Sequence, residues 1–273
     1  MTSNLLGDEI EDILRESIDD AGDELLFVDP SAAAVEALIE LGTAYDGDLP
    51  TVKLIADERM LKDVMDDFLI ASNAADLVEA GALELRNLDE DTDNALLVTA
   101  DRTVAVVAAG GAVAGLATDD EEFVALAYED YTERFDAADT FNLRTPAISR
   151  VRQTMADDIG EQSRDDFDSV LQSLETARGD GDGLDEVTIS LLVAAKNDVL
   201  LYDISKWGED VGIASKATFS RTKTRLEELG LIDTEKVPID VGRPRLRLKL
   251  GDERLHGADA EELASVAQSM IAS

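Results

Sequence analysis

The first part of the chain alternates short apolar runs with longer stretches in which apolar residues recur every three or four positions. Over residues 4–20 this recurrence, with acidic residues between, predicts an amphipathic helix. Apolar runs at 25–29 and 51–57 predict strands, and each is followed by a segment of helical periodicity, at 30–41 and 58–72. This strand–helix–strand–helix order favours a parallel sheet with crossover helices.

Further along the chain, the gaps between apolar runs become too short for crossover helices. A third strand is expected at 83–88, and the runs at 95–99, 104–108 and 113–117 are typical of strands joined as hairpins. Asp119 is expected to cap the long amphipathic helix that follows. The predicted fold class of the N-terminal region is α/β, with a parallel-type sheet, crossover helices and additional hairpins.

Helical periodicity returns after this region and leads to a break in the chain. Helices are predicted at about 146–159 and 163–178, and the sequence GDGDG at 179–183 is typical of a linker. The linker resembles half of a calcium-binding loop. Because the full spacing of acidic residues and the distant Glu are missing, we expect no metal site there.

The segment after the linker has the pattern of a helix-turn-helix. A first helix is predicted over 184–196, and Ile204, Trp207 and Val211 lie three and four positions apart on a second. Gly212 then permits a tight, left-handed turn. A polar residue that can cap a third helix follows within three positions.

The third helix is predicted to begin at Lys216, with Ser215 as its cap and with Phe219, Leu226 and Leu229 facing the core. Its other face is polar and basic, as a helix in the major groove requires. Lys223 is expected to pack its stem while its ammonium reaches a phosphate. The residues expected to contact DNA from this helix are Ser215, Lys216, Thr218, Ser220, Arg221, Thr222, Lys223 and Arg225.

A β-hairpin, or wing, is predicted after the third helix. Leucines at 246, 248 and 250 alternate with basic residues at 245, 247 and 249, which places the two kinds on opposite faces of a strand. Arg243 lies at the expected tip, where it can enter a narrow minor groove. The wing residues expected to contact DNA are Arg243, Arg245 and Arg247.

The alternative is that these bases form an ordinary solvated surface. The chain has 61 acidic residues against 24 Lys and Arg and a net charge of -37, whereas residues 216–249 contain nine bases and five acids. A basic strip in so acidic a chain favours a nucleic-acid surface. The expected organisation is an α/β regulatory domain at 1–142, a helical connector and linker at 143–183, and a winged helix DNA-binding domain with a C-terminal helix at 184–273.

Several functional classes conflict with the composition. The absence of Cys excludes disulfides and thiolate sites, and the single histidine, His256, excludes multi-histidine metal sites. Phosphate-binding glycine motifs and a nucleophile elbow are absent from the sequence, so we expect no catalytic residues and no cofactor. An N-terminus without a signal-peptide pattern, and the lack of an 18-residue apolar run, predict a cytoplasmic protein with no membrane segment.

The quoted motifs resemble known regulators. SKATFSRTKTRLEELGLI and GRPR are similar to the recognition helix and wing of bacterial and archaeal winged helix regulators. Together with DELLFVDPSAAAVEALIELG and LLVTADRTVAVVAAGG, they make the whole chain resemble haloarchaeal TbsP-like regulators. Its acid-rich composition likewise resembles proteins from salt-filled haloarchaeal cytoplasm. The N-terminal part is also similar to TrmB-type effector domains, which have a phospholipase D-like fold.

These resemblances imply a regulator of central carbon metabolism genes with a sugar or sugar phosphate as effector. The N-terminal domain either senses a small molecule or mediates dimerisation. The alternatives are a module that binds a small molecule or a protein without DNA and, less favoured, an enzyme acting on an anionic substrate. Because single winged helices need a second half-site, we expect a homodimer on double-stranded DNA. The helices at 163–178 and 258–271, the latter with Leu263, Val266 and Met270 in line, are the expected seams.

Overall fold

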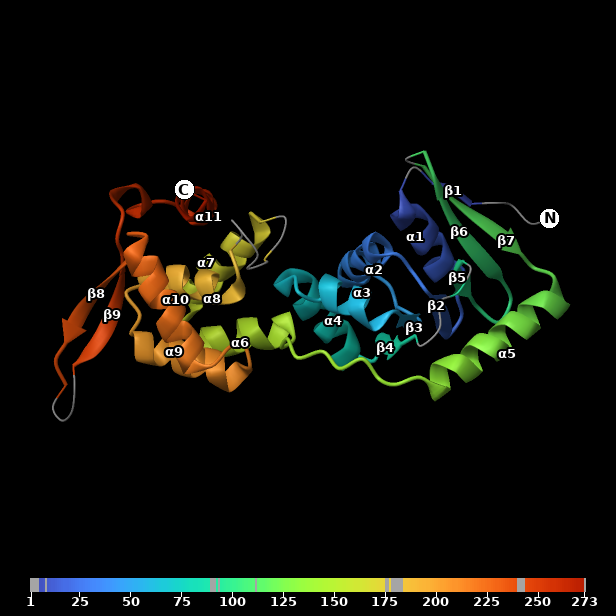
Figure 1. Cartoon of the computed structure of the whole chain (residues 1–273), viewed down its shortest axis with the longest axis horizontal. Coiled ribbons are helices and arrows are strands. Elements are labelled where there is room, and N and C mark those ends of the chain that lie inside the picture. The colour runs from blue at the N-terminus through green and yellow to red at the C-terminus, as the bar shows by residue number, and fades with distance from the viewer. Residues whose placement is uncertain are drawn as a thin grey trace. The chain divides into compact units, whose positions relative to one another are not determined.

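The computed structural model describes residues 5–7, 9–88, 92, 94–110, 112–174, 177, 184–239 and 244–272. It divides into two compact units (Figure 1). Unit 1 comprises Met1–Asp66 and Asn73–Leu143, and unit 2 comprises Asp67–Ser72 and Arg144–Ser273. The expected linker at 179–183 lies outside the described residues.

Within its described residues, unit 1 contains a sheet of seven strands in the order β1-β7-β6-β5-β2-β3-β4. The strands β2, β3 and β4 are parallel, whereas β5, β6 and β7 form antiparallel hairpins and β5 joins β2 antiparallel. Parallel pairs need a crossover and short turns need an antiparallel partner, so the expected mixture of crossovers and hairpins is confirmed. The strands are β1 (Leu5–Gly7), β2 (Glu24–Val28), β3 (Thr51–Ala56), β4 (Leu83–Asn87), β5 (Ala95–Val98), β6 (Thr103–Ala109) and β7 (Ala112–Thr118).

Two of the helices expected in unit 1 are wrong in extent. The helix expected over 4–20 begins at Ile10, because residues 5–7 pair with β7 as an antiparallel strand. The helix expected over 58–72 is two helices, since Asp67 Oδ1 accepts the backbone N–H of Leu69 at 2.9 Å and thereby starts a new one. The helices are α1 (Ile10–Asp20), α2 (Ala32–Ala44), α3 (Glu58–Val64), α4 (Phe68–Glu79) and α5 (Glu121–Ala137).

Helix α5 is capped by Asp120 instead of Asp119, with Asp120 Oδ1 accepting the N–H of Phe123 at 3.0 Å. Near its other end the ring of Phe135 packs on apolar residues of β2, β3 and β5. Tyr128 donates a hydrogen bond to Glu24 on β2, and Glu24 also pairs with Lys53 of β3 at 2.7 Å. An apolar cluster and a polar bridge therefore both attach α5 to the sheet.

Unit 2 is built around α8, whose residues from 187 to 195 are all buried. Helices α6 and α7, from the region expected as a connector, pack in the same apolar core as α8, α9 and α10. The helix expected at 163–178 ends at Gln172. The elements are α6 (Ile148–Asp158), α7 (Glu161–Gln172), α8 (Glu186–Lys196), α9 (Leu201–Val211), α10 (Lys216–Glu228), β8 (Ile232–Val237), β9 (Arg245–Leu250), a 3-10 turn (Glu253–Leu255) and α11 (Ala260–Ile271).

The apolar residues that motivated the two expected dimer seams lie inside this unit. Leu263 of α11 is 1% exposed, and Val266 and Met270 pack against the same core. Phe167 and Val170 of α7 are also buried. These side chains are therefore used within one chain.

Candidate nucleic-acid interface

Helix α10, the third helix of the helix-turn-helix, packs unusually closely against α9. A Cβ added at Gly208 would lie 2.3 Å from two ring atoms of Phe219, so glycine is the residue that fits there. After α9, Gly212 adopts φ 98 in the left-handed region, and its N–H and that of Ile213 both reach the carbonyl of Gly208. The turn then delivers Ser215, whose Oγ accepts the N–H of Thr218 at 3.2 Å and caps α10.

Helix α10 has a buried face and an open face. Phe219 and Leu226 are 0% and 1% exposed and join the core, as the sequence predicts. The opposite face exposes Ser215, Ser220, Arg221 and Arg225, with Thr218 and Thr222 half-buried beside them. Among the residues that the structure describes, neither Arg221 nor Arg225 has a carboxylate partner, although Arg221 Nη2 lies 3.4 Å from Thr218 Oγ1. Two guanidinium groups are thus available on this face.

Two lysines of α10 have carboxylate partners. Lys216 Nζ lies 2.7 Å from Glu209 Oε2 of α9, and this hydrogen bond raises the pKa of Lys216 and lowers that of Glu209. Lys223 Nζ lies 2.7 Å from Glu227 Oε2, and the other carboxylate oxygen of Glu227 accepts a hydrogen bond from the Thr234 hydroxyl. The Lys223 side chain is 12% exposed, so its ammonium is held at the junction of α10 and β8.

The wing has a third strand-like segment that sequence patterns missed. The N–H of Leu248 donates to the carbonyl of Val199 at 2.9 Å, and Leu200 bridges Arg247, so residues 199–200 lie beside β9. On its other side β9 pairs antiparallel with β8. Leu248 is fully buried against the helices. A two-residue segment has too little alternation to be predicted as a strand.

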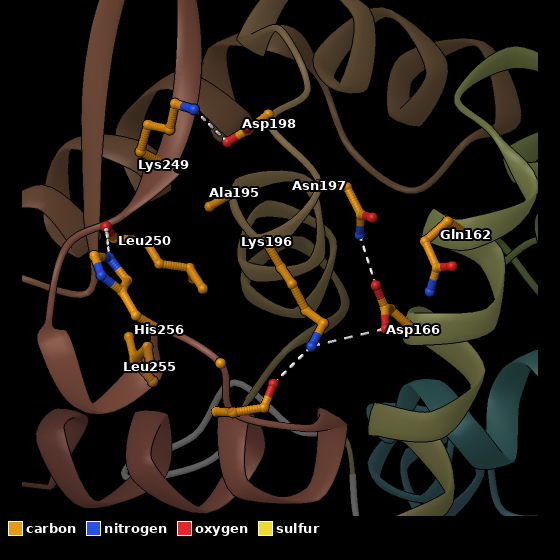
Figure 2. A pocket seen from close by; sticks show the side chains of 12 residues that line it. Gln162, Asp166, Ala195, Lys196, Asn197, Asp198, Lys249, Leu250, Leu255 and His256 are labelled. Atoms are coloured by element: carbon orange, nitrogen blue, oxygen red, sulfur yellow. Dashed lines mark hydrogen bonds and ion pairs between the residues drawn. The ribbon is translucent and has the colours of Figure 1, made fainter.

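The bases of β9 are flanked by acidic residues. Arg245 lies 3.5 Å from Asp203 and 4.4 Å above the ring of Tyr202. Lys249 Nζ lies 2.6 Å from Asp198 Oδ1, and Figure 2 shows the two side chains pointing toward each other. Across the hairpin, Arg247 is in register with Glu235. Asp198, Asp203 and Glu209 were missed by sequence reasoning, because nothing in the sequence places them beside these bases.

The remaining predicted wing residue, Arg243, lies outside the described residues, as does the rest of the tip. The single histidine, His256, is exposed, and its Nε2 lies 2.9 Å from the carbonyl oxygen of Leu250. In the part of the chain that is described, no acidic or histidine cluster could hold a metal ion. Over the same residues no helix combines the length and apolarity needed to cross a membrane.

A helix, turn, recognition helix and hairpin in this order match a known family. The model of the C-terminal HTH domain of TbsP-like transcriptional regulators matches residues 147–268, and the model of their N-terminal domain matches residues 2–146. The chain belongs to the TbsP-like transcriptional regulators. Helices α6 and α7 of this TbsP-like chain thus fall within the part matched by the family's HTH domain.

Among curated protein sequences, none matches this TbsP-like chain. Among solved structures, TrmBL2, described as an archaeal chromatin protein with a novel mode of DNA binding, is 19% identical over 51% of this chain and 53% of its own, with a TM-score of 0.36. The TbsP-like chain therefore spans about half of TrmBL2. Nuc, a phospholipase D family member from Salmonella typhimurium, is 11% identical over 51% and 98%, also with a TM-score of 0.36. Neither likeness bears on the function of the TbsP-like chain.

Proposed function

We propose that this TbsP-like chain regulates transcription by binding duplex DNA sequence-specifically through α10 and the wing. The observation that carries the proposal is the open face of α10, where Arg221 and Arg225 are exposed on a helix whose start is fixed by Ser215. Such a face can place short polar side chains at base edges and guanidinium groups at phosphates or guanine. The HTH family assignment supports the same function.

The roles within the interface follow from position. Ser220 and Thr222, with Thr218 near the start of α10, are proposed to meet base edges, while Lys216 and the arginines of α10 meet phosphate or guanine. Arg243 is proposed to enter the minor groove from the wing tip. Arg245 and Arg247 are proposed to contact the phosphate backbone of the DNA. Lys223 is proposed to attract the DNA electrostatically without touching it, because its ammonium is held by Glu227.

The test is DNA binding by Arg221→Ala. Loss of a guanidinium contact should weaken binding to an operator by about 1–3 kcal/mol, measured by fluorescence anisotropy. The matched control is Arg150→Ala, which removes an exposed arginine from α6 of the same unit. Equal affinities of Arg221→Ala, Arg150→Ala and the unaltered chain would contradict the proposal. Footprinting of bound DNA across a haloarchaeal genome would test the proposed control of central carbon metabolism genes.

We also propose that the protein binds DNA as a homodimer, because one winged helix reads one half-site. Many apolar side chains of α7 and α11, the helices expected to form the seam, pack in the core of unit 2. Light scattering in molar salt should give twice the mass of one chain. A single-chain mass at the concentrations that bind DNA would contradict the dimer.

Unit 1 is proposed to sense a sugar or sugar phosphate, with a dimerisation platform as the alternative. A groove of about 790 Å³ lies between α5 and strands β5 to β7, and Thr103, Thr118, Tyr131 and Arg134 line it beside Phe123. Its hydroxyls and aromatic rings suit a polyol, and a phosphate would have to compete with Asp130, which also lines the groove and pairs with Arg134 at 3.0 Å. A sugar phosphate at 100 times its dissociation constant should stabilise the protein by about 2.7 kcal/mol, which a thermal-shift screen detects.

A further inference from the structure

Two bases of the proposed DNA interface, Lys216 and Arg245, and the neighbouring base Lys249 of β9 are held by carboxylates from one stretch of the chain. That stretch is α9 and the turn before it, residues 198–211. Its acids pair with bases on two other elements, namely Lys249 with Asp198 at 2.6 Å, Arg245 with Asp203 at 3.5 Å, and Lys216 with Glu209 at 2.7 Å. Each of these side chains is between 38% and 55% exposed, so the pairs are accessible from solvent.

In each pair a carboxylate of the protein occupies the place beside the base that a DNA phosphate would take. A DNA phosphate that approaches Lys216 must displace the Glu209 carboxylate, which also accepts the backbone N–H of Lys216 at 3.4 Å. Exposed ion pairs contribute little to folding stability. A DNA phosphate can therefore replace the carboxylate beside such a base without destabilising the fold. The pair between Lys223 and Glu227 differs, because Lys223 is 12% exposed and Glu227 also holds Thr234.

The exchange changes the ion balance of binding. When a free base meets a phosphate, counterions leave the DNA and the affinity falls steeply with salt. When a paired base does so, its carboxylate is released into solvent and takes up cations in turn. The net number of ions released is then smaller, so the affinity depends less on salt.

We propose that Asp198, Asp203 and Glu209 are affinity-setting residues, which hold Lys249, Arg245 and Lys216 until DNA phosphates replace them. They lower affinity at low salt and flatten its salt dependence. The inference rests on the proposed DNA binding by this unit. It extends that function to acidic residues that are not themselves DNA contacts.

The experiment compares the whole chain with Glu209→Gln, Asp203→Asn, Asp198→Asn and the triple variant. Affinity for one duplex is measured by fluorescence anisotropy over a potassium chloride series. Each single variant should bind about two- to fivefold more tightly at the lowest salt, the range expected when an exposed pair no longer competes. The triple variant should also show a steeper fall of log affinity with log salt.

The matched control is Asp210→Asn, which makes the same charge change on the same helix. Asp210 pairs with Lys206, which is not a proposed DNA contact. If Asp210→Asn tightens binding as much as Glu209→Gln, or if the triple variant keeps the original salt slope, net charge explains the effect and the inference is overturned. If neither the unaltered chain nor the variants bind any duplex, the proposed function itself fails. Binding that depends on Arg221 but is unchanged by the three acidic substitutions rejects this inference alone.

Discussion

Gly208 shows how one residue sets the distance between two helices. The ring of Phe219 occupies the space that a side chain at 208 would need, and Phe219 is fully buried. The sequence indicated that Phe219 faces the core, but nothing in it showed which residue of α9 it would meet. A helical pattern specifies a face, whereas the contact between two faces depends on their crossing.

Gly208→Ala is therefore expected to destabilise unit 2 by about 1–3 kcal/mol, because an overpacked core must shift a ring or a helix. The free energy of unfolding is measured in urea by the fluorescence of Trp207, the chain's single tryptophan, which lies next to Gly208 in α9. Alanine is favoured over glycine inside a helix, so a loss of stability at this position has to come from the clash with the ring. An unchanged or higher free energy of unfolding in Gly208→Ala would contradict this close packing.

The bridge between α5 and the sheet predicts a pH dependence. Burial alone would raise the pKa of Glu24, but hydrogen bonds from Lys53 and Tyr128 outweigh it and leave the pKa below 4.5. The bond to Glu24 raises the pKa of Tyr128 to about 12. The stabilisation from Glu24 is present above 4.5 and is lost as pH falls through the lowered pKa. That from Tyr128 is complete below 10 and is lost as pH rises to about 12.

In Glu24→Gln, Tyr128 should ionise closer to pH 10, which tyrosinate absorbance detects. In the unaltered chain, the tyrosine that ionises at about pH 12 gives a late rise in absorbance. Tyr128→Phe assigns this late rise to Tyr128, because it removes only this one of the four tyrosines. A late step that persists unchanged in Glu24→Gln would separate the tyrosine from the carboxylate and contradict the bridge.

At the scale of elements, sequence patterns located most helices and strands but not all of their ends. The helix-turn-helix is predicted well, because Gly212 and Ser215 carry local signals of a turn and a cap. The break between α3 and α4 and the strand β1 were missed. Asp67 resembles many other acidic residues of the chain, and three residues are too few to show alternation. The acidic partners of β9 were missed because they depend on a pairing across 42 to 51 positions.

The start of α10 is open to a test that separates folding from binding. Ser215→Ala removes the cap and should cost about 0.5–2 kcal/mol of stability, with weaker DNA binding in parallel. Ser215→Asp keeps a capping oxygen and should retain stability, yet its charge faces the proposed phosphates and should weaken binding further. Trp207 fluorescence in urea and anisotropy give the two readouts. Strong binding by Ser215→Asp would place the DNA away from this end of the helix.

At the scale of the whole molecule, a net charge of -37 makes stability depend on how well salt screens the repulsion between acidic residues. Like charges about 10 Å apart repel at 0.1 M salt, whereas at 1 M the screening length is about 3 Å. The melting temperature should therefore rise as potassium chloride increases over this range, as scanning calorimetry would show. An equal rise in sucrose would assign the effect to exclusion from the surface instead of screening. A flat curve would contradict the resemblance of this composition to proteins that work in molar salt.

The turn before α9 can change its charge without a change of backbone conformation. Asp198 adopts φ 57, a left-handed conformation in which Asp and Asn are both well tolerated. Exchanging one for the other at this position removes or restores the partner of Lys249 with little backbone strain. Under the proposed competition with DNA phosphates, this single exchange would change the DNA affinity while the backbone of the turn stays the same.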